Sequence, residues 1–175
     1  LDIPNERSSH STPTPTGGGV SIVVIFISFL LVAELIFNET FDEVFVLAFT
    51  GSVLAIVGYI DDHRHLSARW RLLVHFLVSF VLLLSLKQLP ELSVFGYQWP
   101  SGWLLSGLYL IALVWLLNLF NFMDGIDGIA GVQAVTALSG AALILWSAGS
   151  SFWPIMLMAL SASILGFLVF NWPPA

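Results

Sequence analysis

Two groups of acidic residues interrupt a chain that is otherwise strongly apolar. Asp61 and Asp62 stand side by side in GYIDDHRHLS, and Asp124 and Asp127 lie close together in NLFNFMDGIDG. Carboxylates that repel one another and lose hydration near a lipid bilayer need a cation, a proton or an arginine beside them. We therefore expect a positively charged partner at these aspartates. Binding of an anionic substrate through a metal ion is chemistry that such residues support.

The second group also contains two asparagines, Asn118 and Asn121, and two glycines, Gly125 and Gly128. Residues spaced three apart drift by about 60° per step on an α-helix, so Asn118 and Asp127 would face opposite sides of a continuous helix. The glycines instead indicate a break near Gly125, with Asp127 capping the next span. Free amide groups at such a helix start bind phosphate, and a phosphate beside aspartates needs a bridging Mg²⁺.

The composition indicates a membrane protein that must position these groups on helices. Hydrophobic residues make up 58% of the 175 residues and charged residues only 9%, against about a quarter charged in a soluble domain. A bilayer core of about 30 Å needs about 20 helical residues, so we expect an all-α polytopic membrane helix bundle. The third span is the shortest, and it holds His75, which we interpret as a packed, hydrogen-bonded histidine. The six predicted spans are Val20–Phe37, Val44–Ile60, Leu72–Leu86, Trp103–Phe120, Ile129–Trp146 and Phe152–Phe170.

The basic residues predict how these spans are oriented. Six spans alternate the loops between two faces, and one face receives Arg7, Arg64, Arg69 and Arg71, whereas the other receives only Lys87. The positive-inside rule makes the arginine-rich face cytoplasmic. Both groups of aspartates are therefore predicted to lie at the cytoplasmic ends of their spans.

The chain is expected to form a single integral membrane domain, residues 1–175, that is truncated at both ends. It begins at Leu1 on a polar segment and stops at NWPPA directly after a span. It has no cysteine, so it gives no information on the redox compartment. Its five basic residues are too few to form a positively charged surface that would bind the phosphate backbone of DNA or RNA. We therefore expect no nucleic-acid partner.

Other interpretations of the acidic residues stay open at this point. A cation- or proton-coupled membrane transporter would also use paired carboxylates, but it would place them near the middle of the membrane. Their predicted place at the cytoplasmic ends favours an enzyme that meets a soluble substrate. A non-catalytic scaffold explains the hydrophobicity and leaves the aspartates unexplained. At single positions, Asp127 equally suits a structural N-cap, and Glu34 either reaches the outer interface or faces the bundle.

Four motifs in order resemble one family of membrane enzymes. They are DIPNERSSHSTPTPTGGG, GYIDDHRHLS, NLFNFMDGIDGIAG and FNWPPA, and together they span nearly the whole chain. They resemble the polyprenyl-phosphate N-acetylhexosamine-1-phosphate transferases, of the glycosyltransferase family 4 type, which start peptidoglycan, O-antigen and teichoic acid. NERSSH and NFMDGIDGIAG are most similar to the branch that initiates the O-antigen of lipopolysaccharide.

The resemblance implies an activity, a cofactor and a location. Members of this family transfer an N-acetylhexosamine-1-phosphate, or a related amino-sugar-1-phosphate, from a UDP-sugar to undecaprenyl phosphate, and they release UMP. The reaction uses Mg²⁺, for which Mn²⁺ is the alternative, and it begins a lipid-linked glycan of the cell envelope. The expected location is the bacterial inner membrane, with the active site on its cytoplasmic face. A homodimer is compatible with the resemblance.

The resemblance also implies site residues. Asp61 and Asp62 match the family's adjacent aspartates, and Asp124 and Asp127 match its D-G-x-D-G pair, so these four are the expected catalytic residues. Asp127 and Asp124 are the expected metal ligands. The expected substrate-binding residues are Asn5, Arg7, His10, Arg71, Asn118, Asn121 and Asn171.

This chain departs from the family pattern at several positions and covers only part of it. Arg71 stands where lysine is common and His75 where glutamine is common, and Ser8 and Thr16 stand where many members carry a basic residue. The family has a span before the first motif, and an aspartate in F-M-G-D and a histidine-rich loop after the last. We therefore expect this chain by itself to lack transfer activity.

Overall fold

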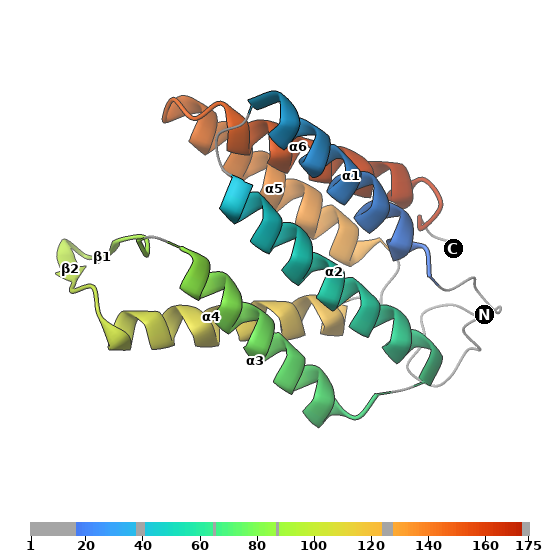
Figure 1. The fold of residues 1–175 in the computed structure, drawn as a ribbon, viewed down its shortest axis with the longest axis horizontal. Helices are drawn as coiled ribbons and strands as arrows, with labels where there is room; N and C mark the ends of the chain where they lie inside the picture. The colour runs from blue at the N-terminus through green and yellow to red at the C-terminus, as the bar shows by residue number, and fades with distance from the viewer. Residues whose placement is uncertain (1–16, 38–40, 65, 87, 124–127, 173–175) are drawn as a thin grey trace. The chain divides into compact units, whose positions relative to one another are not determined.

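A computed structural model describes most of the chain as helices joined by short connections (Figure 1). The described residues are 17–37, 41–64, 66–86, 88–123 and 128–172. Within them lie six helices, which confirms the predicted all-α membrane bundle. The helices are α1 Gly19–Phe37, α2 Phe41–Arg64, α3 Ala68–Ser85, α4 Trp103–Met123, α5 Ile129–Ser147 and α6 Phe152–Leu168.

The helices match the six predicted spans closely in position. By length and composition, five of the described helices, α1 to α5, can cross a membrane. The third window, which was the shortest in the sequence, extends to 18 residues because α3 begins at Ala68. The last is shorter than expected, since α6 has 17 residues and ends at Leu168. The chain divides into two compact units, which are residues 1–39 with 120–175 and residues 40–119.

In the first unit, α1 and α5 both pack against α6. The ring of Phe37 at the end of α1 meets that of Phe152 at the start of α6, with centroids 5.7 Å apart. At the opposite ends, Gly18 lies so close to Phe167 that a Cβ atom there would come within 2.5 Å of the ring. The two helices are therefore antiparallel along their whole length, and their shared interior holds Leu30 at 0% exposure.

The α5–α6 contact is built on small residues. A Cβ atom added at Gly131 would lie 2.6 Å from a methyl carbon of Leu168, and the Ser139 and Ser161 hydroxyl oxygens are 3.2 Å apart. Small side chains let membrane helices approach closely, and hydroxyls bond between helices where lipid offers no partner. This contact aligns the start of α5 with the end of α6.

Glu34 faces the interior of this unit, which decides between its two predicted orientations. Its side chain is buried, with 5% of the residue exposed. Neither of its carboxyl oxygens has a hydrogen-bond partner within the described part of the chain. It does not reach out to the interface, although an ionisable group inside a span is costly to bury.

In the second unit, α2 and α3 pack as an antiparallel hairpin (Figure 1). A two-stranded β-hairpin, which the sequence analysis did not predict, joins α3 to α4. Its strands are β1 Leu92–Val94 and β2 Tyr97–Trp99, paired so that Leu92 faces Trp99 and Val94 faces Tyr97. Phe95 and Gly96 have φ values of 51° and 82°, which a type I′ turn requires. The Tyr109 hydroxyl of α4 donates to the Pro90 carbonyl at 2.9 Å. This bond links α4 to the segment just before β1.

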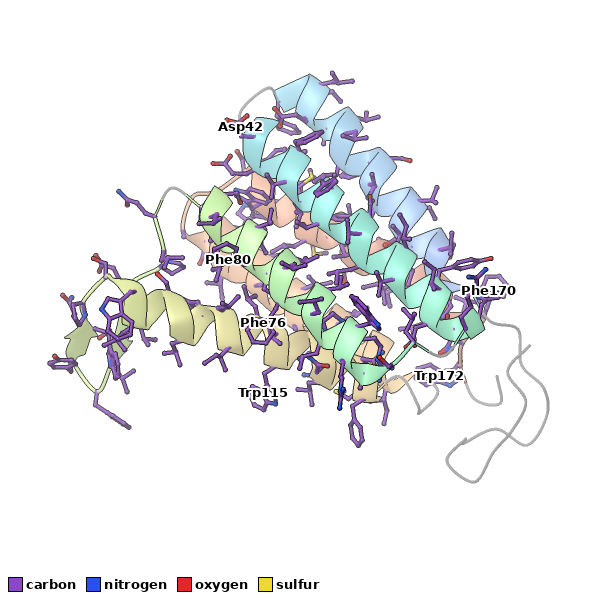
Figure 2. All side chains as sticks on the ribbon, turned by 60° about the horizontal axis from the view of Figure 1, so that its bottom comes forward. Asp42, Phe76, Phe80, Trp115, Phe170 and Trp172 are labelled. Carbon is purple, nitrogen blue, oxygen red and sulfur yellow. The ribbon has the colours of Figure 1, made fainter. Side chains whose placement is uncertain are left out.

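The outer faces of the second unit are apolar. Phe76 and Phe80 on α3 and Trp115 on α4 are all exposed, and Figure 2 shows their side chains standing away from the ribbon. Among the described residues, no other helix packs along the length of α4. Apolar exposure of this kind suits helices whose surroundings are lipid or further membrane helices.

Candidate functional site

Asp61 has the positively charged partner that the sequence predicted. It lies in the last turn of α2, and Arg71 lies in the first turn of α3, across a connection of three residues. The Arg71 Nη1 atom donates to Asp61 Oδ2 at 2.7 Å. The backbone amide of Leu66, in the connection, donates to Asp61 Oδ1 at 2.7 Å. Both carboxylate oxygens of Asp61 are thus engaged within the hairpin.

The two adjacent aspartates differ in exposure and direction. The side chain of Asp61 is 15% exposed and that of Arg71 is 32% exposed, and charge-assisted hydrogen bonds of this length are strong. Asp62 is exposed at the end of the same helix, and neighbouring helical positions point about 100° apart. Asp61 therefore anchors Arg71, while Asp62 faces a different direction.

A second group of polar residues lies one helical turn deeper in the hairpin unit. The His75 side chain on α3 lies near Asn118 on α4 and near Arg71. The Asn118 Nδ2 atom donates to the Val114 carbonyl at 2.7 Å. The interpretation of His75 as a packed, hydrogen-bonded histidine stays a prediction. Its Nδ1 atom is buried and has no hydrogen-bond partner among the described residues.

Polar side chains from three helices of one unit therefore lie in the same region. Asp61 on α2 is bonded to Arg71 on α3, and His75 on α3 lies near Asn118 on α4. Arg71 and His75 lie on one face of α3 because residues four apart on a helix are neighbours. Arg71 and Asn118 are predicted to bind substrate, and the structure also gives each of them a partner in the protein.

At the start of α5, the structure shows a contact that the sequence did not predict. The Gly128 amide donates to Asn171 Oδ1 at 3.3 Å, which joins two motifs 43 residues apart. Gly128 has a φ of 75° and occupies the N-cap position of α5. The expected cap was Asp127, so the cap position is corrected by one residue. The predicted helix break is confirmed, because a left-handed residue cannot continue a helix.

Several of the predicted site residues lie outside the described residues, so the contacts expected of them stay predictions. Asn121 is described, and it is exposed in the last turn of α4. Within the described part of the chain, no group of three acidic, histidine or cysteine residues could hold a metal ion. The residues outside are Asn5, Arg7, His10, Asp124 and Asp127.

The first unit also has an apolar groove near the Gly128–Asn171 contact. It has a volume of about 550 Å³ and lies between Val132 and Val135 of α5 and Leu165 and Leu168 of α6. The indole of Trp172 lines its end. A lining of this kind suits hydrocarbon, and it offers few partners to a sugar or a phosphate.

The chain is similar to known transferases. The family model described as glycosyl transferase family 4 matches residues 44–175. A relative in Bacillus subtilis (strain 168), named as a probable undecaprenyl-phosphate N-acetylglucosaminyl 1-phosphate transferase, is 27% identical over all of this chain and 49% of its own length. Phospho-N-acetylmuramoyl-pentapeptide-transferase of Shouchella clausii (strain KSM-K16) is 31% identical over 93% of this chain and 54% of its own length.

The same transferase name recurs in Kosmotoga olearia, whose protein is 27% identical over 95% of this chain and 54% of its own length. The chain thus spans about half the length of the curated relatives it matches. No solved structure matches it significantly. The family match covers most of the chain and includes both groups of aspartates. By this match, the chain belongs to glycosyl transferase family 4.

Proposed function

We propose that the complete protein, meaning the gene product in its natural length, is an undecaprenyl-phosphate sugar-1-phosphate transferase. It moves N-acetylhexosamine-1-phosphate from a UDP-sugar to undecaprenyl phosphate and releases UMP. The observation that carries this proposal is the family match over residues 44–175, which includes both groups of aspartates. The names of the relatives in Bacillus subtilis and Shouchella clausii support the same class of reaction.

The proposed reaction is an attack by one phosphate on another. An oxygen of the lipid phosphate forms a bond to the β-phosphorus of the UDP-sugar. The bond between that phosphorus and the oxygen bridging to the α-phosphate breaks, and its electron pair leaves with UMP. A phosphate monoester has a second pKa of about 6, so much of the attacking group is a dianion at neutral pH. The main demand on the protein is therefore to neutralise and align negative charges.

Arg71 and the two adjacent aspartates share the work of handling phosphate charge in this proposal. The Arg71 guanidinium supplies fixed positive charge at the end of the hairpin, and its 2.7 Å bond to Asp61 holds it in place. We assign Asp61 or Asp62 to orient the lipid phosphate and to accept a residual proton from it, and the bonds from Arg71 and the Leu66 amide hold Asp61 in place.

A magnesium ion is part of the proposal, and the chemistry of the donor residues fits it. Asp124, Asp127 and Asn121 offer carboxylate and amide oxygens, which are the donors that Mg²⁺ prefers. The described residues alone contain no suitable acidic cluster, so the site would need the aspartates of the D-G-x-D-G motif. When bound, the ion would neutralise charge on the diphosphate.

The proposed location is the bacterial inner membrane, with the site on the cytoplasmic face. Apolar helices long enough to cross a membrane and bacterial relatives support a multi-pass membrane protein. The positive-inside rule supports the cytoplasmic side, because Arg64, Arg69 and Arg71 gather around the connection between α2 and α3. UDP-sugars are soluble, and this face would give them access.

The test is exchange of labelled UMP into UDP-sugar. Membranes that contain the complete protein, undecaprenyl phosphate, Mg²⁺ and a panel of UDP-N-acetylhexosamines should convert labelled UMP into labelled UDP-sugar. The Asp124→Asn variant, at equal abundance, is the control and should show no exchange. Absence of exchange with every sugar, together with cation- or proton-driven uptake into vesicles, would replace the proposal with the transporter.

A further inference from the structure

The β-hairpin between α3 and α4 has one apolar face and one polar face. Residues that pair directly across two strands lie on the same face of the sheet, and successive residues along a strand alternate between faces. One face is therefore formed by two apolar pairs, Leu92–Trp99 and Val94–Tyr97. The pair between them, Ser93 with Gln98, lies on the opposite face. The hairpin is thus a small amphipathic sheet.

The apolar face is open. Val94, Tyr97 and Trp99 are all exposed, and the rings of Tyr97 and Trp99 meet edge to face with centroids 6.5 Å apart. Within the described part of the chain, no helix packs extensively against either strand. Figure 1 shows the hairpin at the end of the unit where α4 begins. An aromatic surface has therefore been assembled without a cover from the described residues.

The tip of the hairpin carries a residue that the turn itself disfavours. Phe95 has a φ of 51°, and this left-handed conformation is costly for a bulky side chain. Asparagine or glycine usually occupies such a position. The Phe95 side chain is fully exposed, so no contact with the described residues offsets the backbone cost. A strained residue that projects outward indicates a contact beyond the chain.

The level of the hairpin in the membrane follows from α4. This helix has 21 residues, which makes it about 32 Å long, close to the thickness of about 30 Å of a bilayer core. Its exposed first residue, Trp103, then lies at the core boundary. Four Cα steps of 3.8 Å, or about 15 Å at most, separate Trp99 from Trp103. On the other side, the bond from Tyr109 holds Pro90 beside the first two turns of α4. Both ends of the hairpin are therefore held at the membrane surface.

We propose that the apolar face of the hairpin, together with Phe95, binds lipid at the boundary between headgroups and acyl chains and leaves the polar face in water. Tyrosine and tryptophan favour this boundary because their rings are amphipathic. Among residues 88–102, Glu91 is the only charged residue, so the binding does not depend on anionic headgroups. This surface lies outside the proposed transfer site, and the proposal does not require transfer activity.

The test measures the depth of single nitroxide labels on the complete protein in phosphatidylcholine vesicles. Each label is attached to one introduced cysteine, and any cysteine elsewhere in the complete protein is replaced first. Val94→Cys and Phe95→Cys report on the apolar face and the tip. Ser93→Cys and Gln98→Cys, on the opposite face of the same strands, are the matched controls. Collision with oxygen, which concentrates in lipid, is compared with collision with a nickel chelate, which stays in water.

The expected result is an alternation in depth along the strands. The Val94→Cys and Phe95→Cys labels should favour oxygen and lie about 5–10 Å below the headgroup boundary, as the apolar faces of amphipathic helices do. The Ser93→Cys and Gln98→Cys labels should favour the nickel chelate. Addition of phosphatidylglycerol should leave the depths unchanged. Nickel accessibility at all four positions would overturn the proposal. Protection of the Val94→Cys label from both reagents would also overturn it, because another part of the protein or a second copy would then cover the face.

Substitution of Phe95 tests the role of the tip. Phe95→Asn accepts the left-handed turn more easily than the parent residue, so it should keep the strand register while it removes the aromatic ring. In the Val94→Cys protein, Phe95→Asn should lower the ratio of oxygen to nickel collisions. Phe95→Trp, the control, should keep that ratio. An unchanged ratio in Phe95→Asn would show that the tip does not bind lipid.

Tryptophan fluorescence repeats the test without a label. Brominated lipids quench only those tryptophans that touch their acyl chains. The emission that is lost in Trp99→Phe, measured as the difference from the parent, is the emission of Trp99. Brominated lipid should quench this difference emission. Difference emission that brominated lipid leaves unchanged, while an aqueous quencher reduces it, would place Trp99 in water and overturn the proposal.

Discussion

The Asp61–Arg71 pair explains how the Asp61 carboxylate is tolerated at the end of a membrane helix. The 2.7 Å bond to Arg71 and the 2.7 Å bond from the Leu66 amide together engage both oxygens of Asp61. An arginine is suited to this because its planar guanidinium keeps further N–H donors when one is engaged. Arg71 can therefore hold Asp61 and still present donors to an anionic substrate.

The first prediction concerns the charge of Arg71. Arg71→Gln should lower the rate of UMP release by the complete protein by about 100-fold, the usual order for losing one group that stabilises transition-state charge. Arg71→Lys keeps the positive charge but loses the planar guanidinium and its fixed set of N–H donors. Its rate of UMP release should therefore fall between those of the parent and of Arg71→Gln. Arg69→Gln is the matched control, because Arg69 is exposed two residues away. Equal rates for Arg71→Gln and Arg69→Gln would contradict the role of Arg71.

The second prediction concerns Asp127 in the D-G-x-D-G motif. Asp127→Asn keeps the size of the side chain and removes its charge. Transfer by the complete protein should be abolished, whereas expression and melting temperature should stay near those of the parent. If Mg²⁺-dependent activity remained within about tenfold, a barrier change of only about 1.4 kcal/mol, Asp127 would not be a metal ligand.

Sequence reasoning predicted the kinds of partner at these residues better than the partners themselves. Two adjacent carboxylates require positive charge, so a basic partner of the kind that Arg71 provides to Asp61 was predictable. The bond from Gly128 to Asn171 joins residues 43 positions apart, and only the packing of α5 on α6 brings them together. Motif spacing carries no information on that packing, and the cap was misplaced onto Asp127 for the same reason.

Among the elements, the α5–α6 pair shows most directly how packing fixes the site. Gly131 has no side chain where Leu168 approaches it, and the two serine hydroxyls of the pair meet farther along, at 3.2 Å. Close approach at Gly131 places the end of α6 beside the start of α5. The Gly128–Asn171 bond depends on that register, because it joins those same two helix ends.

The third prediction tests this register through thermal unfolding of the detergent-solubilised protein. Gly131→Val would place a Cβ atom 2.6 Å from Leu168 and add two methyl groups beyond it, and overpacking of this kind costs about 1–3 kcal/mol. Gly140→Val in the same helix is the control, because a Cβ atom there has no neighbour within 4 Å. The melting temperature should fall more for Gly131→Val. Equal shifts would show that the close contact at Gly131 does not stabilise the pair.

The helices could be predicted from the sequence, and the β-hairpin could not. Long apolar runs bounded by polar or glycine-rich segments specify spans with little help from tertiary contacts, so all six predicted spans appear as helices. The hairpin has strands of only three residues each. Its turn is formed by Phe95 and Gly96 rather than by the Asn-Gly pair that usually marks a type I′ turn. Phe95, a bulky residue at the first position of the turn, gives no local sequence signal for a hairpin.

For the molecule as a whole, orientation in the membrane decides whether the proposed chemistry is reachable. The connection between α2 and α3 is flanked by Arg64, Arg69 and Arg71, and the hairpin between α3 and α4 exposes Phe95, Tyr97 and Trp99. Arginines favour the cytoplasmic side, and aromatic residues favour a membrane–water interface. Because α3 is long enough to cross a membrane, we expect these two connections to lie on opposite sides.

The fourth prediction uses the absence of cysteine from this chain, which gives a clean background for labelling. Ser67→Cys, in the connection before α3, should be protected in intact cells from a maleimide that cannot cross the inner membrane. Ser101→Cys, before α4, should be labelled. Both serines are exposed, so protection would report the side of the membrane. Labelling of Ser67→Cys in sealed cells would place the Asp61–Arg71 pair outside and remove access to cytoplasmic UDP-sugars.

The central claim, transfer of a sugar together with its phosphate, is tested most directly with a doubly labelled donor. A UDP-N-acetylhexosamine that carries tritium in the sugar and ³²P in the β-phosphate is incubated with the complete protein, undecaprenyl phosphate and Mg²⁺. The account predicts that both labels enter the lipid product in equal molar amounts and that UMP is released. Tritium in the lipid with ³²P left behind in UDP would show ordinary glycosyl transfer and contradict the account.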